Sequence, residues 1–239
     1  MSAIISPQLH DHTVKYLSTA TGRDRIHRFL QYFSRFLIWH GQKNGYEKET
    51  LERLTKFMGS LAQTRKLMRV GRQIEFVRNI QKAQTLRDDV SRVTLIVKNA
   101  FLALWLVHDT CQWANTAGVV KFENIKDLSR RGMKCWLIAL IASFLGDLHK
   151  LRLNSQRIQH ESKVLKASQA KGLPDDTAVK ALKTLQIERN KIRMATLQDS
   201  LDILIPASGL EYVKLETGIV GLIGAFTSIL GGITQWRSI

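Results

Sequence analysis

Cysteine, proline and strand-type patterns are scarce in this chain of 239 residues. Its two cysteines, Cys111 and Cys135, are too few for a disulfide framework and are typical of a reducing compartment. The three prolines, and the lack of turn dipeptides between alternating strands, predict a nearly all-helical chain. Asn44-Gly45 separates two segments of helical periodicity and therefore predicts an interhelical turn.

The motifs of common enzymes and metal sites are missing as well. The sequence holds no phosphate-binding loop, no Cys-x-x-Cys pair and no His-Glu-x-x-His helix. We therefore expect no enzyme, no cofactor and no metal site. Two small clusters lack partners at ligand spacing and are typical of ordinary helix surfaces: His10 with His12, and His108 with Asp109 and Cys111.

Acidic residues are also few. The chain has 20 Asp and Glu residues but 36 Lys and Arg residues, which gives a net charge of +16. Such a balance indicates an anionic partner, either nucleic acid or an acidic membrane surface. No zinc finger, basic zipper or base-stacking module is recognisable, so we expect no nucleic acid and favour the membrane. The N-terminus lacks a basic region followed by an apolar run, and we expect no cleavable signal peptide.

Residues 1–92 contain two segments of amphipathic helical pattern. The first, 17–40, places an apolar stripe of Ile26, Phe29, Leu30, Phe33, Phe36 and Leu37 on one helix face. Thr21 with Asp24 resembles a capping box, which predicts a helix start near Gly22. We expect the stripe to pack in a bundle or against a second copy, with the flanking arginines near lipid phosphate.

The second segment, 65–82, is predicted to be a basic amphipathic helix that begins where the apolar stripe changes face. Few apolar residues beside a basic polar face are typical of a helix in the headgroup plane of an anionic bilayer, although a solvated bundle helix has the same pattern. The expected membrane-inserting face is Leu67, Val70, Ile74 and Val77. The expected phospholipid headgroup contacts are Arg65, Arg69, Arg72 and Lys82.

The middle of the chain divides into an apolar and a polar part. Residues 93–148 hold two apolar runs, one interrupted by Lys98 and Asn99 and one confined between Lys134 and Asp147. Both are short against the roughly 20 residues that cross a bilayer, so buried core helices and shallow membrane helices stay open. Residues 149–212 are predicted to be a basic helical region interrupted at Gly172 and Pro174.

Residues 213–239 are predicted to contain a transmembrane helix and a short tail. The run 217–236 has no charged residue and ends in Trp236, which fits the length and the interfacial aromatic of a membrane span. Gly224, Ser228 and Gly232 recur every four residues and form a line on which another helix can approach closely. We interpret this line as a self-association face. The expected fold is thus an all-α, membrane-associated helical bundle with amphipathic helices and a C-terminal transmembrane helix.

Four blocks of the sequence, in order, resemble the peroxin-eleven family of peroxisomal membrane proteins, fungal type. The first is "LSTATGRDRIHRFLQYFSRF", with Gly22-Arg23-Asp24, Arg28 and Gln31-Tyr32 as its distinctive positions. The others are "RKLMRVGRQIEF", "LWLVHDTCQWANTAGV" with Asp109 and Trp113, and "LDILIPASGLEYVKLETGIVGLIGAFTSILGG" with Pro206.

The resemblance implies a peroxisomal membrane protein that elongates the membrane and promotes peroxisome proliferation and fission. It implies a wedge-like amphipathic helix, a homo-oligomer that concentrates the wedges, and fission machinery including a dynamin-related protein as partners. It also implies an alternative function, a pore for small metabolites across the peroxisomal membrane.

Overall fold

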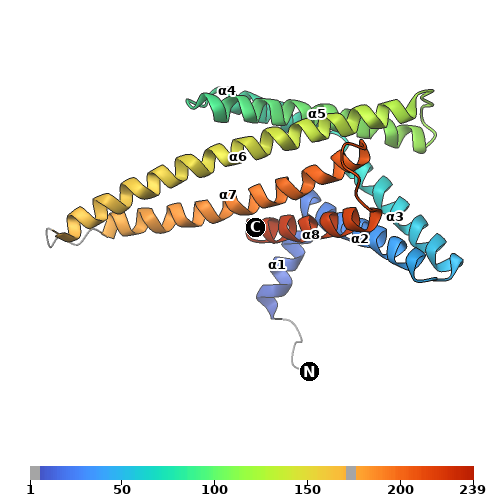
Figure 1. The fold of residues 1–239 in the computed structure, drawn as a ribbon, viewed down its shortest axis with the longest axis horizontal. Coiled ribbons are helices and arrows are strands. Elements are labelled where there is room, and N and C mark those ends of the chain that lie inside the picture. The colour runs from blue at the N-terminus through green and yellow to red at the C-terminus, as the bar shows by residue number, and fades with distance from the viewer. Residues whose placement is uncertain (1–5, 171–175) are drawn as a thin grey trace.

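The computed structural model describes residues 6–170 and 176–239, and within these ranges the chain forms helices and no strands. The all-α prediction is confirmed. Figure 1 shows the order of the helices along the chain, which are α1 (Pro7–Ser18), α2 (Ala20–Lys43), α3 (Lys48–Met68), α4 (Gln73–Gln84), α5 (Asp89–Thr116), α6 (Ile125–Ala170), α7 (Asp176–Gly209) and α8 (Thr217–Trp236).

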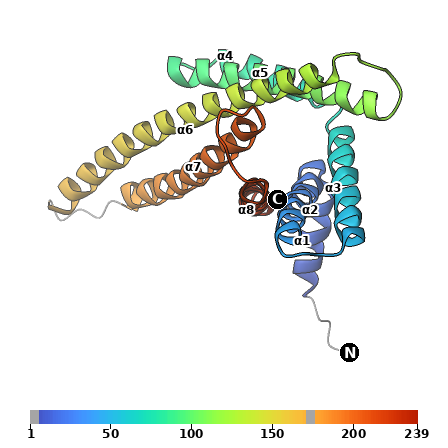
Figure 2. The ribbon, with the colours of Figure 1, turned by 45° about the vertical axis from the view of Figure 1, so that its right-hand side comes forward.

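The helices pack as a set of antiparallel pairs. The main contacts join α2 with α3, α4 with α5, α5 with α6, α6 with α7, and α2 with α8. The long pair of α6 and α7 extends away from α2 and α3, as both views show (Figures 1 and 2). The N-terminal and C-terminal parts of the sequence therefore meet at one end of the molecule.

A small core holds that end together. Tyr32 of α2, Ile205 of α7, and Val220 and Ala225 of α8 are buried against one another. Trp136 of α6 packs against the same cluster. Helices from the predicted segments 1–92 and 213–239 thus share one core.

Local signals decide several helix ends. Ser6 caps α1 by accepting a hydrogen bond from the Leu9 amide at 3.2 Å, and Gly45 takes a φ of +70° in the predicted turn between α2 and α3. The predicted capping box at Thr21 is wrong by two residues, because Thr19 is the N-cap of α2 and accepts from the Gly22 amide at 2.9 Å. Gly172 and Pro174, expected to interrupt the basic region, lie outside the described residues.

Three of the described helices, α5, α6 and α8, are long and apolar enough to cross a membrane. The predicted span at 217–236 has the same bounds as α8. The two middle runs, short as uninterrupted apolar stretches, belong to the helices of 28 and 46 residues that are α5 and α6. The charged residues that interrupt or bound the two runs are themselves part of α5 and α6. The sequence alone therefore did not give the length of these helices.

Candidate functional site

The predicted membrane-inserting residues form an exposed apolar row on α4 and the segment before it. Leu67 is 50% exposed, Val70 46%, Ile74 76% and Val77 51%. Leu67 lies in the last turn of α3, Val70 lies in the turn that follows, and Ile74 and Val77 belong to α4. Four large apolar side chains left without cover by the rest of the chain favour a role at an apolar partner surface.

The expected continuous helix over 65–82 is wrong, because α3 ends at Met68 and α4 begins at Gln73. Gly71 lies in the connecting turn. Its φ of +86° is a backbone conformation that glycine adopts without a steric penalty. The predicted change of face near Leu67 is therefore a real break in the helix. The exposed row runs across this break.

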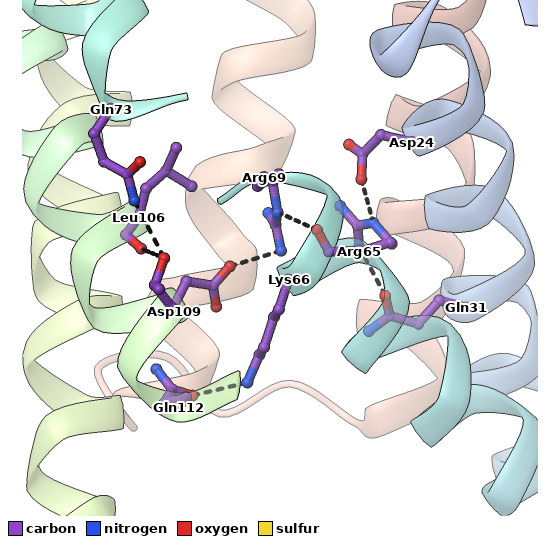
Figure 3. Close-up of polar contacts among 10 residues, drawn as sticks. Asp24, Gln31, Arg65, Lys66, Arg69, Gln73, Leu106, Asp109 and Gln112 are labelled. Atoms are coloured by element: carbon purple, nitrogen blue, oxygen red, sulfur yellow. Dashed lines mark hydrogen bonds and ion pairs between the residues drawn. The ribbon is translucent and has the colours of Figure 1, made fainter. Parts of the chain in front are cut away.

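Arg65 and Arg69 were predicted to contact phospholipid headgroups, but both side chains are buried inside the chain. Arg65 donates to Asp24 Oδ1 at 2.9 Å and to Gln31 Oε1 at 2.7 Å, which ties α3 to α2. Arg69 pairs with Asp109 on α5 at 2.7 Å (Figure 3). In this conformation their guanidinium groups are engaged by carboxylates of the same chain and are not free at the surface.

Further polar contacts reinforce the same junction, as Figure 3 shows. Arg69 Nε donates to the Arg65 carbonyl at 3.0 Å, and its guanidinium lies 4.8 Å from the centroid of the Trp105 ring. Lys66 donates to Gln112 Oε1 at 3.0 Å, and Gln73 donates to Thr110 Oγ1 at 3.2 Å. The break between α3 and α4 is thus fixed to α5 by polar contacts on its inner side.

Arg72 and Lys82, the other two predicted headgroup contacts, are accessible at the surface. Lys82 is exposed on α4, and Arg72 is partly exposed and faces Glu75 at 3.4 Å. An exposed pair of this kind contributes little energy and is easily exchanged for another anion. Two of the four predicted basic residues therefore stay available beside the exposed apolar row.

The predicted self-association line of α8 faces the same chain instead of the surface. A Cβ built on Gly224 would overlap the ring of Tyr32, so the glycine lets this ring of α2 approach the α8 backbone. Ser228 is buried and donates to the Gly224 carbonyl at 2.5 Å. A Cβ on Gly232 would lie 3.4 Å from Tyr16 Oη. Close helix approach, as small residues allow, occurs here between α8 and the N-terminal helices.

The opposite face of α8 presents large apolar side chains. Half of the apolar stretch of α8 is buried within the chain. The exposed large residues recur at helical spacing: Ile219, Leu222, Phe226, Ile229 and Ile233. This face suits lipid, while the small-residue face serves packing.

One carboxylate joins three helices beneath α8. Asp202 of α7 accepts from Arg28 of α2 at 2.6 Å and from the Thr227 hydroxyl of α8 at 2.6 Å. All three residues are buried. Removing one partner of a buried ion pair typically costs about 3–5 kcal/mol, because the other charge stays uncompensated.

Comparison with known proteins identifies the family. A family profile described as "Peroxisomal biogenesis factor 11 (PEX11)" matches residues 10–236. The chain belongs to the PEX11 family. Membership makes this a peroxisomal membrane protein with a role in peroxisome biogenesis.

Individual PEX11 relatives match along nearly the whole chain. "Peroxisomal biogenesis factor 11" of Schizosaccharomyces pombe is 26% identical and covers 99% of this chain and 98% of its own length. "Peroxisomal membrane protein PMP30B" of Candida boidinii is 26% identical over 94% of this chain and 93% of its own length. "Peroxisomal membrane protein PMP27" of Saccharomyces cerevisiae is 26% identical with the same coverage. No solved structure matches the chain.

The residues that carry the PEX11 resemblance prove to be partners in the buried contacts. Asp24 and Gln31 accept hydrogen bonds from Arg65. Asp109 forms an ion pair with Arg69, and Arg28 forms one with Asp202. Sequence reasoning identified these positions as distinctive but assigned none of the pairings. Asp202 and Thr227 were missed entirely, since their partners lie far away in the sequence.

Proposed function

We propose that this PEX11 protein elongates the peroxisomal membrane by inserting the exposed apolar row into one leaflet. The observation that carries the proposal is the exposure of Leu67, Val70, Ile74 and Val77, beside the accessible cations Arg72 and Lys82. Each of these apolar side chains contributes on the order of 1.5–3 kcal/mol when fully buried, and less at interfacial depth. Each cation adds roughly 1 kcal/mol near an anionic surface.

Anchoring by α8 and self-association complete the proposed mechanism. The exposed apolar face of α8 contacts lipid, which keeps the α3–α4 break close to the bilayer. Homo-oligomers concentrate the inserted rows, and fission machinery including a dynamin-related protein then acts on the tubule. Since Gly224 packs against Tyr32 of α2 and Ser228 is buried within the same chain, we assign self-association to other surfaces.

The test replaces Ile74 by Asp in the full-length protein reconstituted into vesicles of phosphatidylcholine and phosphatidylserine. Ile74 is largely uncovered by the rest of the chain, so Ile74→Asp should leave the fold intact and abolish tubules seen by electron microscopy. Ile187→Asp is the matched control, because Ile187 is 51% exposed but lies on α7, in the long α6–α7 pair. Tubulation that survives Ile74→Asp, or that Ile187→Asp also removes, contradicts the proposal.

Conductance separates this function from the alternative, a pore for small metabolites. The wild-type protein should tubulate vesicles and show no stable conductance in planar bilayers. A stable conductance that Ile74→Asp leaves unchanged would favour the pore.

A further inference from the structure

A cavity of about 360 Å³ lies behind the α3–α4 break, between α2, α3, α5, α6 and α7. Its volume is within the range of roughly 300–1,000 Å³ that small-molecule sites occupy. Six cationic side chains line it: Arg25, Arg28, Arg65, Lys66, Arg69 and Arg72. Four carboxylates face them: Asp24, Asp109, Asp199 and Asp202. The lining therefore carries two positive charges more than negative ones.

The ion pairs around the cavity leave a subset of the cations without a carboxylate. Three pairs account for Asp24, Asp109 and Asp202. In the described part of the chain, Arg25 and Lys66 make no ion pair within 4.0 Å. Lys66 donates to the neutral Gln112. Arg25 and Lys66 thus line the cavity without an ion-pair partner of their own, although Asp24 and Asp202 attract Arg25 and Asp109 attracts Lys66 from a greater distance.

A second observation comes from Arg28, which is 5% exposed. Its Nη2 donates to Asp202, whereas its buried Nη1 has no hydrogen-bond partner. A buried N–H without an acceptor is costly, and most such groups are satisfied in native proteins. Arg28 lines the cavity, so an acceptor bound there would satisfy this donor.

Burial and like charges shape the titration of these groups. Burial lowers the pKa of Arg25, and the neighbouring Arg28 lowers it further. Burial also lowers the pKa of Lys66. Burial raises the pKa of the Asp199 carboxyl, which favours its neutral form. Asp199 is the one lining acid that has no arginine partner. All three directions reflect a poorly solvated space, and for Arg25 and Lys66 a neighbouring arginine acts in the same direction as burial.

We infer that this cavity binds a phosphate monoester, either a free metabolite or the headgroup of a lipid. A phosphate monoester carries about −1.5 to −2 charges at neutral pH, which matches the excess of two positive charges. Its oxygens accept from guanidinium groups with good geometry, and one of them supplies the acceptor for Arg28 Nη1. The Arg72 side chain is 29% exposed and also lines the cavity.

A bound phosphate would join α2 to the α3–α4 break, since Arg28 and Arg72 come from these two parts of the chain. Insertion of the apolar row does not require the site. Failure of the site and failure of the proposed function are therefore distinguishable.

The experiment measures binding by the full-length protein in neutral detergent. Isothermal titration calorimetry uses glycerol 3-phosphate as the free monoester. A parallel assay mixes the protein with nanodiscs of phosphatidylcholine that contain either phosphatidic acid or phosphatidylserine. Saturable binding of glycerol 3-phosphate alone identifies a free ligand, and preference for phosphatidic acid over phosphatidylserine identifies a lipid headgroup.

Two variants and a matched control make the result specific. Arg28→Lys keeps a cation for Asp202 but removes the unbonded Nη1, and Arg72→Gln touches no buried ion pair. Each should weaken binding about tenfold, the effect of losing one charge-assisted hydrogen bond. Arg53→Gln, an exposed change of the same charge on α3, should leave binding unchanged. If Arg28→Lys does not fold by circular dichroism, the effect of Arg72→Gln on glycerol 3-phosphate binding decides alone, because that assay contains no anionic membrane that Arg72 could contact.

The inference is overturned if neither monoester probe binds saturably. Equal affinity in Arg72→Gln and Arg53→Gln would overturn it too, because binding would then follow net charge and not the cavity.

Discussion

Gly224 provides a direct test of whether the small residues of α8 serve the fold of one chain. Gly224→Ala adds a single methyl group, whose carbon would lie 2.7 Å from Cδ2 of the buried Tyr32 ring and closer still to Cδ1 and Cγ. Such overpacking typically costs about 1–3 kcal/mol. The gain in helix propensity from Gly to Ala offsets roughly 0.5–1 kcal/mol of that. We therefore expect a net loss of about 1 kcal/mol, and of at most about 2.5 kcal/mol, in the free energy of unfolding.

The assay is thermal unfolding of the full-length protein in detergent micelles, combined with crosslinking in membranes. For a chain of this size, a loss of about 1 kcal/mol lowers the unfolding midpoint by roughly 2–4 °C. Gly59→Ala is the matched control, because its new methyl group on α3 meets nothing within 4 Å and should raise the midpoint. Gly232→Ala makes only a contact at 3.4 Å with the Tyr16 hydroxyl and should not lower it.

One combination of results would refute this reasoning. Gly224→Ala would have to unfold at or above the wild-type temperature while the yield of crosslinked dimer falls. The small residues would then belong to an interface between copies, and the packing of α8 on α2 would not describe the protein in the membrane.

Two further predictions concern α8 and the buried ion pairs. Leu222→Arg with Phe226→Arg places two charges on the exposed face of α8, each costing about 2.5–3.5 kcal/mol in a bilayer centre, and should make the protein extractable by alkaline carbonate. Tyr212→Arg, an exposed position before α8, is the control, and continued resistance of the double variant would assign the anchor to α5 and α6. The second prediction follows from Asp24, where burial acts to raise the pKa but Arg65 and Arg69 bring it below the ordinary value of 3.8. A lowered carboxyl pKa stabilises the fold above that ordinary value, and this stabilisation is lost as the pH falls through the lower folded-state pKa. Acid unfolding of detergent-solubilised protein followed by tryptophan fluorescence should therefore shift in Asp24→Asn, and an identical acid transition would contradict the pairing.

The sequence predicted those features that depend on neighbours along the chain. The turn at Gly45 follows from a glycine between two periodic segments, and the bounds of α8 follow from the length of an uncharged run. The exposure of Ile74 and Val77 also agrees with the predicted face of α4. Local patterns suffice here because each feature is determined within a few helical turns.

The residues whose surroundings the sequence did not predict have partners that are distant in the sequence. Arg65 and Arg72 look alike as members of a basic helix, yet one is buried against Asp24 and the other is partly exposed. Periodicity gives the face on which a residue lies but not the element that covers that face. The same reason explains Gly224, because a small residue predicts close approach without saying which helix approaches.

The contact of Asp202 with Arg28 and Thr227 has a consequence for the order in which the protein is made. Arg28 leaves the ribosome long before either partner, since Asp202 lies 174 positions further along the chain. Until α8 has been synthesised, α2 lacks both its apolar cover and the full set of contacts around its buried guanidinium. The N-terminal helices therefore cannot complete their packing during translation. Their core forms fully only when α8, with its 20 residues, has been released from the ribosome.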